Sequence, residues 1–207
     1  MVMMEPPNEW PSEIQESYDP IRILGKGGFA SVVLARTKPT ASTTEDPISD
    51  ETRTDTQKVA IKVVGGIHET DIHLTARHIR QQRDRAVLYA RREIEILKHV
   101  SHHNIVRLFH HWTVQEKDFD DDEKKNMTKI DTTNELTAAV LVLEYVKGPT
   151  VESLLKYGGA LSTTFGRVII AQAMDAIAYL HCHAVLHRDI KPDNVLGKLF
   201  DSSQDEW

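Results

Sequence analysis

The sequence predicts an α+β protein, because segments with strand character come first along the chain and helical patterns follow them. The early segments IRILGKGGFASVVLART and KVAIKVV combine β-branched and apolar residues with glycine turns, which is typical of strands. In the later segment STTFGRVIIAQAMDAIAYLHCH, apolar residues recur every three or four positions, which indicates one face of a helix. No internal repeat is visible.

Composition excludes several classes of function. The 207 residues are 40% hydrophobic and 27% charged, as in ordinary globular proteins, and the net charge is −6. A negative chain offers no basic field for a nucleic-acid backbone, and no apolar run is long enough to predict a membrane span. The acidic, proline-bearing leader at 1–20 does not resemble a secretory signal, and the single Cys182 cannot form an internal disulfide. We therefore expect an intracellular protein, cytoplasmic or nuclear.

The first half of the chain reads as strands interrupted by two inserts. Residues 37–57 and 116–136 are rich in Thr, Ser, Asp and Glu and poor in apolar residues, so we expect disordered loops there. Residues 104–114 and 136–146 are expected strands, the second buried in the centre of a sheet. Between the inserts, a helix at about 75–100 is predicted from one apolar face: Ala86, Ala90, Ile94 and Leu97.

Helices are expected in the second half. Thr150 can cap the short helix VESLLKY, with Glu152 well placed against the helix dipole, and Gly158 and Gly159 break the chain after it. The longer helix that follows carries one apolar stripe: Phe165, Ile169, Ala173, Ile177 and Leu180.

Three clusters carry candidate chemistry. Gly25 and Gly27 lie in a bend between two strands, where backbone N–H groups can approach phosphate oxygens, although a purely structural hairpin would look similar. Lys62 stands within a strand and requires either an anionic partner or an exposed face. Glu93 on the long helix is a candidate partner, with Glu95 as its near neighbour.

The third cluster is HRDIKPDNVL, which contains His187 and Arg188. Asp189 offers a carboxylate that can orient and deprotonate a hydroxyl, Lys191 is a nearby cation, and Asn194 offers a neutral oxygen to a hard metal ion. Another group, His181, Cys182, His183 and His187, invites a metal interpretation, but tetrahedral sites usually draw paired ligands from two segments, which favours ordinary helix-end and loop histidines instead.

Taken together in this order, the three clusters resemble those of the eukaryotic protein kinase family, from about Ile21 to Leu196. The resemblance implies a complete N-lobe at 21–146, with an antiparallel sheet and an αC helix. It also implies the first helices of an incomplete C-lobe at 147–196, followed by a divergent tail at 197–207. The segment DIKPDN, which contains Lys191, resembles the corresponding segment of serine/threonine kinases rather than that of tyrosine kinases.

The resemblance also implies roles for individual residues. Lys62 would grip the ATP phosphates and Glu93 would hold Lys62, while Asp189 would be the catalytic base and Asn194 a Mg²⁺ ligand, with Lys191 beside them. Leu143 would be the gatekeeper, and Glu144 and Val146 would meet the adenine edge. The remaining nucleotide contacts implied are Leu24, Gly25, Lys26, Gly27, Gly28, Phe29, Ala30, Ser31, Val32, Ala60, Thr150 at the ribose, and Leu196.

Two departures from the family pattern change the expectation. Ala30 replaces the third glycine, which is a minor change. No DFG follows Asn194, where Asp201 and Asp205 are the only acidic candidates before Glu206, so the main Mg²⁺-binding aspartate is missing. The sequence therefore predicts a serine/threonine kinase with ATP and a protein substrate, inactive or nearly so as this chain by itself. The alternative is a non-catalytic ATP-binding module that binds a protein partner through an exposed C-lobe helix.

Overall fold

The computed structural model of the protein describes residues 10–39, 57–65, 76–115 and 136–198. The chain divides into two compact units. The first comprises Met1–Glu95 and Leu108–Glu144, and the second comprises Ile96–Arg107 and Tyr145–Trp207. The loop at 96–107 therefore belongs with the later helices, although the sequence had placed it inside the first lobe. Both predicted inserts lie largely outside the described residues.

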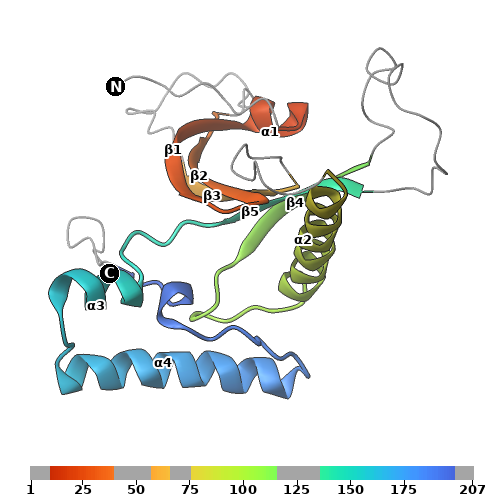
Figure 1. The fold of residues 1–207 in the computed structure, drawn as a ribbon. Helices are drawn as coiled ribbons and strands as arrows, with labels where there is room; N and C mark the ends of the chain where they lie inside the picture. The colour runs from red at the N-terminus through yellow and green to blue at the C-terminus, as the bar shows by residue number, and fades with distance from the viewer. Residues whose placement is uncertain (1–9, 40–56, 66–75, 116–135, 199–207) are drawn as a thin grey trace, which may run out of the picture. The chain divides into compact units, whose positions relative to one another are not determined.

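The first unit is built on a five-stranded antiparallel sheet of order β1-β2-β3-β5-β4 (Figure 1). Its strands are β1 (Tyr18–Lys26), β2 (Ala30–Thr37), β3 (Lys58–Val64), β4 (Leu108–Gln115) and β5 (Leu136–Glu144). Strand β5 lies between β3 and β4, as its near-continuous apolar sequence predicted. The predicted α+β fold class is thus confirmed: the strands form one small antiparallel sheet, and the helices of the second unit follow its last strand.

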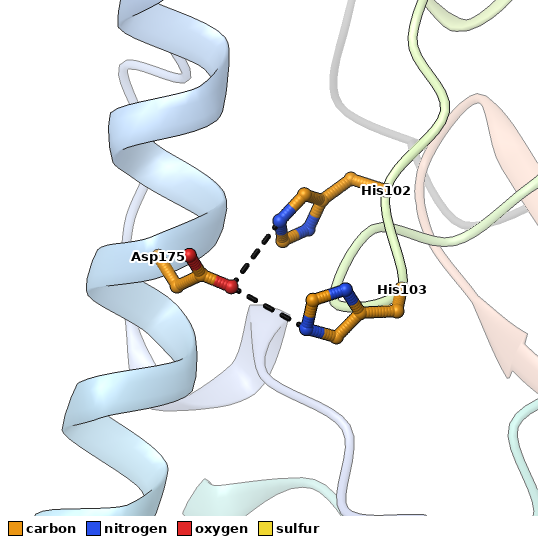
Figure 2. Close-up of side chains that lie close together, drawn as sticks. All are labelled: His102, His103 and Asp175. Carbon is orange, nitrogen blue, oxygen red and sulfur yellow. Dashed lines mark ion pairs between the residues drawn. The ribbon is translucent and has the colours of Figure 1, made fainter.

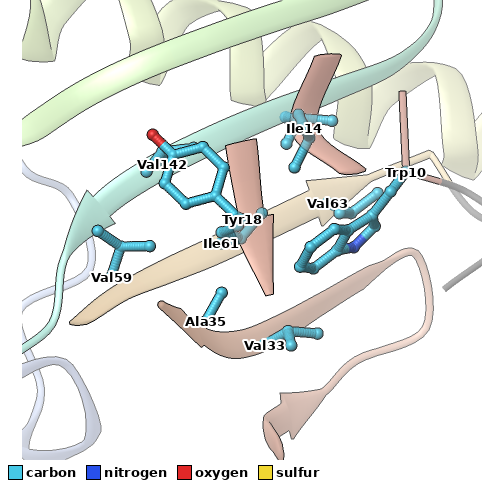
Figure 3. Packing of buried hydrophobic residues seen from close by; sticks show 10 residues of the cluster. Trp10, Ile14, Tyr18, Val33, Ala35, Val59, Ile61, Val63 and Val142 are labelled. Atoms are coloured by element: carbon cyan, nitrogen blue, oxygen red, sulfur yellow. The ribbon is translucent and has the colours of Figure 1, made fainter. Parts of the chain in front are cut away.

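A short helix, α1 (Ser12–Ser17), packs on one face of this sheet. Trp10, Ile14 and Tyr18 are buried among alternate residues of β2, β3 and β5, such as Val33 and Ile61 (Figure 3). The leader predicted from the sequence at residues 1–20 is wrong for residues 10–20. Three apolar side chains at spacings of four place one face of the segment in the core, and Tyr18 already pairs with Thr37 as part of β1.

The helix α2 (Ala76–Leu97) lies within the predicted 75–100 range. Its most buried residues are Val87, Ala90 and Ile94, at spacings of three and four that define one helical face. The predicted members Ala86 and Leu97 are only half-buried, so the buried face is rotated slightly toward Val87.

The second unit contains α3 (Val151–Gly158), α4 (Thr163–Cys182) and the 3-10 helix η3 (Pro192–Asn194). Thr150 caps α3 as predicted: the Ser153 N–H donates to Thr150 Oγ1 at 3.1 Å. Ser162 caps α4 in the same way, by accepting from the Phe165 N–H at 3.3 Å. Gly159 has φ of 75°, a left-handed conformation that suits a glycine just after a helix.

Two details of the sequence prediction were wrong. Strand β4 begins at Leu108 rather than at residue 104, because the Ile105 N–H donates to the His102 carbonyl and closes a turn there. Phe165 is exposed although it was assigned to the buried stripe of α4, because it lies in the first turn of the helix, before the covered part. None of the described helices is long and apolar enough to cross a membrane.

Candidate functional site

The loop between β1 and β2 contains glycines that the described backbone does not require. Gly25, Gly27 and Gly28 have no positive φ. A Cβ added at Gly25 or Gly28 would meet nothing within 4 Å, and one at Gly27 would meet only the Ala30 carbonyl oxygen at 3.6 Å, an ordinary contact. Turn geometry therefore does not explain these glycines. Open space beside backbone N–H groups is the arrangement that a bound phosphate needs.

Strand β3 places Lys62 on the sheet face opposite the α1 core. Val59, Ile61 and Val63 point into that core, so Ala60 and Lys62 point the other way. The cross-strand neighbours of Lys62 are Val32 and Leu141, and the partners of Ala60 are Leu34 and Leu143. Directly opposed residues of antiparallel strands share a face. The predicted adenine contacts Val32 and Ala60, and the predicted gatekeeper Leu143, thus lie on one face with Lys62.

The ammonium group of Lys62 meets Glu93 of α2. Its Nζ lies 2.6 Å from Glu93 Oε2, and both side chains are partly buried. A charge flanked by apolar strand neighbours gains from such a partner, because an unpaired lysine there would lose hydration without compensation. The structure brings these two predicted residues together, and the neighbouring Glu95 is exposed.

In the second unit, Asp189 is the centre of a hydrogen-bonded cluster. Its Oδ2 accepts from Asn194 Nδ2 at 2.9 Å and lies 3.2 Å from Lys191 Nζ. Asn194 Nδ2 also donates to the Asp189 carbonyl oxygen at 2.8 Å. These bonds lower the pKa of Asp189, through Asn194 first and Lys191 second. The carboxylate is therefore charged at neutral pH and exposed to an incoming group.

The backbone around this cluster is strained at one residue. Arg188, directly before Asp189, has φ of 65° in the left-handed region, which costs a non-glycine residue about 1–3 kcal/mol. The Asp189 N–H donates to His187 Nδ1 at 3.3 Å, and η3 follows at Pro192–Asn194. The strained turn points the Asp189, Lys191 and Asn194 side chains toward one another.

A short antiparallel contact joins the start of α3 to the residues that follow η3. The Val151 N–H donates to the Val195 carbonyl and the Gly197 N–H donates to the Pro149 carbonyl, each at 2.9 Å. Thr150 and Leu196, the predicted ribose and adenine contacts of this unit, are therefore bridge partners. Thr150 Oγ1 lies 2.9 Å from Ser153 Oγ and accepts a hydrogen bond from the Ser153 N–H at 3.1 Å.

The remaining predicted contacts are backbone positions around these side chains. Leu24 lies in β1 at a register shift, and Lys26 pairs with Ser31 across the hairpin. Glu144 ends β5 and Val146 follows it. The rest of the predicted loop comprises Gly28, Phe29 and Ala30.

The group of His181, Cys182, His183 and His187, for which the sequence favoured ordinary histidines over a metal site, does not converge on a common point in the structure. Among the described residues, the only group of three or more histidines, cysteines and carboxylates with converging ligand atoms is His102, His103 and Asp175. His183 Nδ1 instead lies 2.8 Å from the Tyr179 carbonyl oxygen, and Cys182 is exposed. The sequence missed the His102 group because its members are brought together only by the fold.

Fold and site both match the protein kinase class. The family model described as protein kinase domain matches residues 51–203, and the chain belongs to this family. It is 30% identical over 190 residues to CBL-interacting protein kinase 21 of Oryza sativa subsp. japonica, covering 92% of this chain and 27% of that protein.

Two other relatives are similar at the same level. CBL-interacting serine/threonine-protein kinase 24 of Arabidopsis thaliana is 29% identical over 179 residues, covering 86% of this chain and 29% of that protein. Serine/threonine-protein kinase chk-2 of Caenorhabditis elegans is 30% identical over 191 residues, covering 90% of this chain and 31% of that protein. The chain thus spans less than a third of each of these serine/threonine kinases.

Proposed function

We propose that this chain carries the ATP-binding and catalytic-loop residues of a serine/threonine protein kinase, which transfers a phosphoryl group from ATP to a protein hydroxyl. The observation that carries the proposal is the Asp189 carboxylate held by Asn194 and Lys191. A charged, exposed carboxylate between an amide and an ammonium group can accept a hydrogen bond from a substrate hydroxyl. The neighbouring cation favours the negative charge of a phosphoryl group.

The first unit supplies the groups for the nucleotide. Lys62, held by Glu93, would pair with the α- and β-phosphates, and the open space at Gly25 and Gly28 would let phosphate oxygens approach the backbone there. The Gly27 N–H already donates to the Ala30 carbonyl oxygen at 2.7 Å. Ala60, Val32 and Leu143 would offer an apolar surface to the adenine. In the second unit, the likeness to the kinase family would make Leu196 an adenine contact and Thr150 the ribose contact.

Asn194 fits a magnesium ion as one ligand. Both of its described hydrogen bonds use Nδ2, so the amide oxygen is the atom that can meet a hard cation. A bound magnesium ion would neutralise charge on the phosphates during transfer. Asp201 and Asp205 lie outside the described residues, and no DFG follows Asn194 in the sequence. We therefore expect the 207-residue chain by itself to bind ATP weakly, to gain little from Mg²⁺, and to transfer no measurable phosphate.

A nucleotide-binding experiment tests the first half of the proposal. Calorimetry should show ATP binding that is lost in Lys62→Ala and retained in Lys58→Ala, an exposed lysine on the same strand. Equal loss in both variants, or no effect of Lys62→Ala, would reject the assigned role of Lys62. A strong increase in ATP affinity on adding Mg²⁺ would show that a second metal ligand exists in the chain.

A transfer assay tests the second half. With labelled ATP and a generic basic substrate protein, we expect no transfer above background. Transfer that disappears in Asp189→Asn would overturn the expected inactivity of this chain and support the catalytic role of Asp189. Transfer that persists in Asp189→Asn would reject that role.

The second candidate function is a non-catalytic ATP- and partner-binding module. The apolar side chains that α4 exposes favour it, because large apolar side chains left exposed on a surface are typical of an interaction site. They are Phe165, Val168, Ile170 and Met174. ATP binding without any transfer, together with association through this helix that Ile170→Ser abolishes, would favour this module over the enzyme.

A further inference from the structure

A second cluster of polar side chains lies in the second unit, away from the residues assigned to phosphoryl transfer. His102 and His103 come from the loop after α2, and Asp175 comes from the middle of α4 (Figure 2). His102 Nε2 lies 3.2 Å from Asp175 Oδ2, and His103 Nε2 lies 3.4 Å from the same oxygen. Each imidazole thus directs its Nε2 atom toward Asp175 Oδ2.

We propose that His102, His103 and Asp175 form a zinc site. Two imidazole nitrogens and one carboxylate oxygen are a donor set that zinc accepts in proteins. In a tetrahedral site with metal–ligand bonds of about 2.0–2.1 Å, neighbouring ligand atoms lie about 3.3 Å apart. The two nitrogen–oxygen separations of 3.2 and 3.4 Å match the edges of such a tetrahedron.

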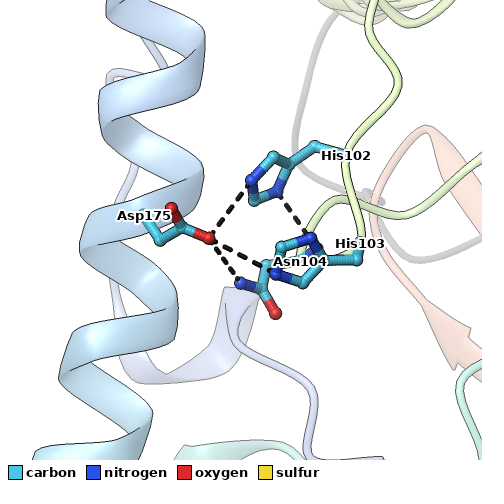
Figure 4. Close-up of polar contacts among 4 residues, drawn as sticks. All are labelled: His102, His103, Asn104 and Asp175. Carbon is cyan, nitrogen blue, oxygen red and sulfur yellow. Dashed lines mark hydrogen bonds and ion pairs between the residues drawn. The ribbon is translucent and has the colours of Figure 1, made fainter.

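The surroundings hold these ligands in place. The rings of His102 and His103 stack with centroids 4.3 Å apart and an interplanar angle of 26°, which keeps their Nε2 atoms side by side. Asn104 Nδ2 donates to Asp175 Oδ2 at 3.2 Å (Figure 4). A hydrogen bond of this kind to a ligating carboxylate is typical of the residues that surround a metal site.

Tyr179, one turn after Asp175 on α4, fixes the loop from the other side. Its hydroxyl accepts from the Ser101 N–H at 3.1 Å, and its ring lies against His102 with centroids 4.9 Å apart. The loop is therefore anchored to α4 without a metal ion. Zinc would add a crosslink between two segments that already lie together, so little conformational ordering opposes its binding.

One hydrogen bond must open when the ion binds. The Asn104 N–H donates to His102 Nδ1 at 3.1 Å, so without metal the ring proton of neutral His102 is on Nε2 and points to Asp175. Zinc would take the place of that proton at Nε2. The proton would move to Nδ1, and the Asn104 N–H would lose its acceptor. This exchange gives the proposed site a signature that binding elsewhere in the chain would not produce.

The site is open to solvent on one side. The His103 side chain is 76% exposed and that of Asp175 is 55% exposed, whereas His102 is largely buried. An ion can therefore reach the ligands directly, and water can occupy the fourth position. Such a site would act as a clamp between the loop at 98–107 and α4. It does not depend on the proposed phosphoryl transfer.

Zinc titration of the whole chain tests the proposal. We expect one Zn²⁺ per chain in competition with a chromophoric chelator, and at least tenfold weaker binding in His103→Asn and in Asp175→Asn. His181→Asn, an exposed histidine on the same helix α4, is the matched control and should bind as the unmodified chain does. Co²⁺ in place of Zn²⁺ should give the visible absorption of a tetrahedral site, which needs no variant and so does not depend on variant folding.

The Asn104 amide supplies an independent readout. Its NMR resonance should shift and its hydrogen exchange should accelerate as Zn²⁺ is added, in step with the titration. Zinc binding that is unchanged in the His103 and Asp175 variants, or that leaves the Asn104 amide unaffected, would overturn the proposal. So would the absence of binding at millimolar Zn²⁺, which would leave the cluster as an ion pair only.

Discussion

The two units differ in how completely they bury their apolar side chains. The largest fully buried side chains all belong to the first unit, and they include Ile14, Ile61 and Leu141. Among the described residues of the second unit, only Val151 and Leu180 are buried hydrophobics. The first unit exposes three large apolar side chains, those of Ile23, Leu88 and Tyr89. The second unit exposes more of them: Ile96, Leu155, Tyr157, Phe165, Val168, Ile170, Met174, Leu186, Ile190 and Leu196.

This difference follows from the two kinds of element. Each central strand of the sheet gains a neighbour on both sides within the same unit, and α1 covers one face. In β5 the consecutive residues Ala139 to Val142 are all fully buried, so both faces of the sheet are covered there. An amphipathic helix buries only the stripe that meets a partner. In helix α4, Leu180 is buried, whereas Ile170 and Met174 are exposed to solvent. We infer that the first unit carries the stability of this chain and that the second carries its interacting surface.

Truncating one aromatic residue in each unit should give the largest contrast. Trp10 is 3% exposed and Tyr157 is 81% exposed. We expect Trp10→Ala to lower the free energy of unfolding by about 3–5 kcal/mol, because it leaves a cavity in the core. Tyr157→Ala should change it by less than about 0.5 kcal/mol. Urea denaturation measures both, and similar effects would show that α1 does not contribute to the core.

Within this comparison, Trp10→Phe separates packing from hydrogen bonding. Among the described residues, Trp10 Nε1 is buried without a hydrogen-bond partner. Phenylalanine would keep part of the packing and remove this unsatisfied donor. It should therefore cost clearly less than Trp10→Ala.

The exposed apolar surface of the second unit should bind an environment-sensitive dye. We expect fluorescence enhancement of 1-anilinonaphthalene-8-sulfonate, and self-association in size-exclusion chromatography. Replacing Ile170 and Met174 with serine should reduce both signals severalfold. The control is Ile23→Ser, an exposed isoleucine of the first unit, which should leave them unchanged. A monomeric, dye-silent chain would contradict the proposed interacting surface.

Limited proteolysis should divide the chain along the same line. We expect cleavage after about residue 147, because few side chains of the second unit are buried. A fragment that retains the sheet should persist, apart from cuts within the inserts. Preferential degradation of the sheet would reverse the assigned order of stability.

Removing the cap of α3 should have a smaller, local effect. Thr150→Ala deletes the acceptor for the Ser153 N–H and should destabilise this helix by about 1 kcal/mol. Hydrogen exchange at Ser153 would report it, with Thr150→Ser as a variant that keeps the cap. If hydrogen exchange in Thr150→Ala were also faster throughout β3, Thr150 would have a role beyond capping α3.

The smallest expected effect concerns the charge of Asp189. Its pKa should lie below that of an ordinary aspartate, and Asn194→Ala and Lys191→Ala should each raise it, since the Asn194 hydrogen bond is the largest single cause and Lys191 acts through a hydrogen bond and its charge. Any stabilisation of the folded protein by the charged Asp189 carboxylate is fully present at pH values above the pKa of Asp189 in the unfolded chain. It is lost as the pH falls through the lower pKa of Asp189 in the folded protein. Carbon-detected NMR titration of the carboxyl group measures this. An unchanged pKa in Asn194→Ala would contradict the described bond.

Most of the elements could be predicted from local patterns, because periodicity and capping are properties of neighbouring residues. The alternation in KVAIKVV placed Val59 and Ile61 on one face and Lys62 on the other, and Thr150 was recognised as a cap. Element ends were less accurate. The turn at His102–Ile105 shortened β4, and nothing in the apolar sequence NIVRL signals that turn.

The sequence by itself determined the class of fold, the order of strands and helices, and the motifs of the kinase family, since each depends on short spacings. Only the tertiary structure decided that residues 10–18 complete the core, that 96–107 joins the later helices, and that His102 and His103 meet Asp175. These outcomes depend on contacts between residues far apart in the chain. Such contacts form where two apolar or polar surfaces fit in three dimensions, and a one-dimensional pattern contains no record of that fit.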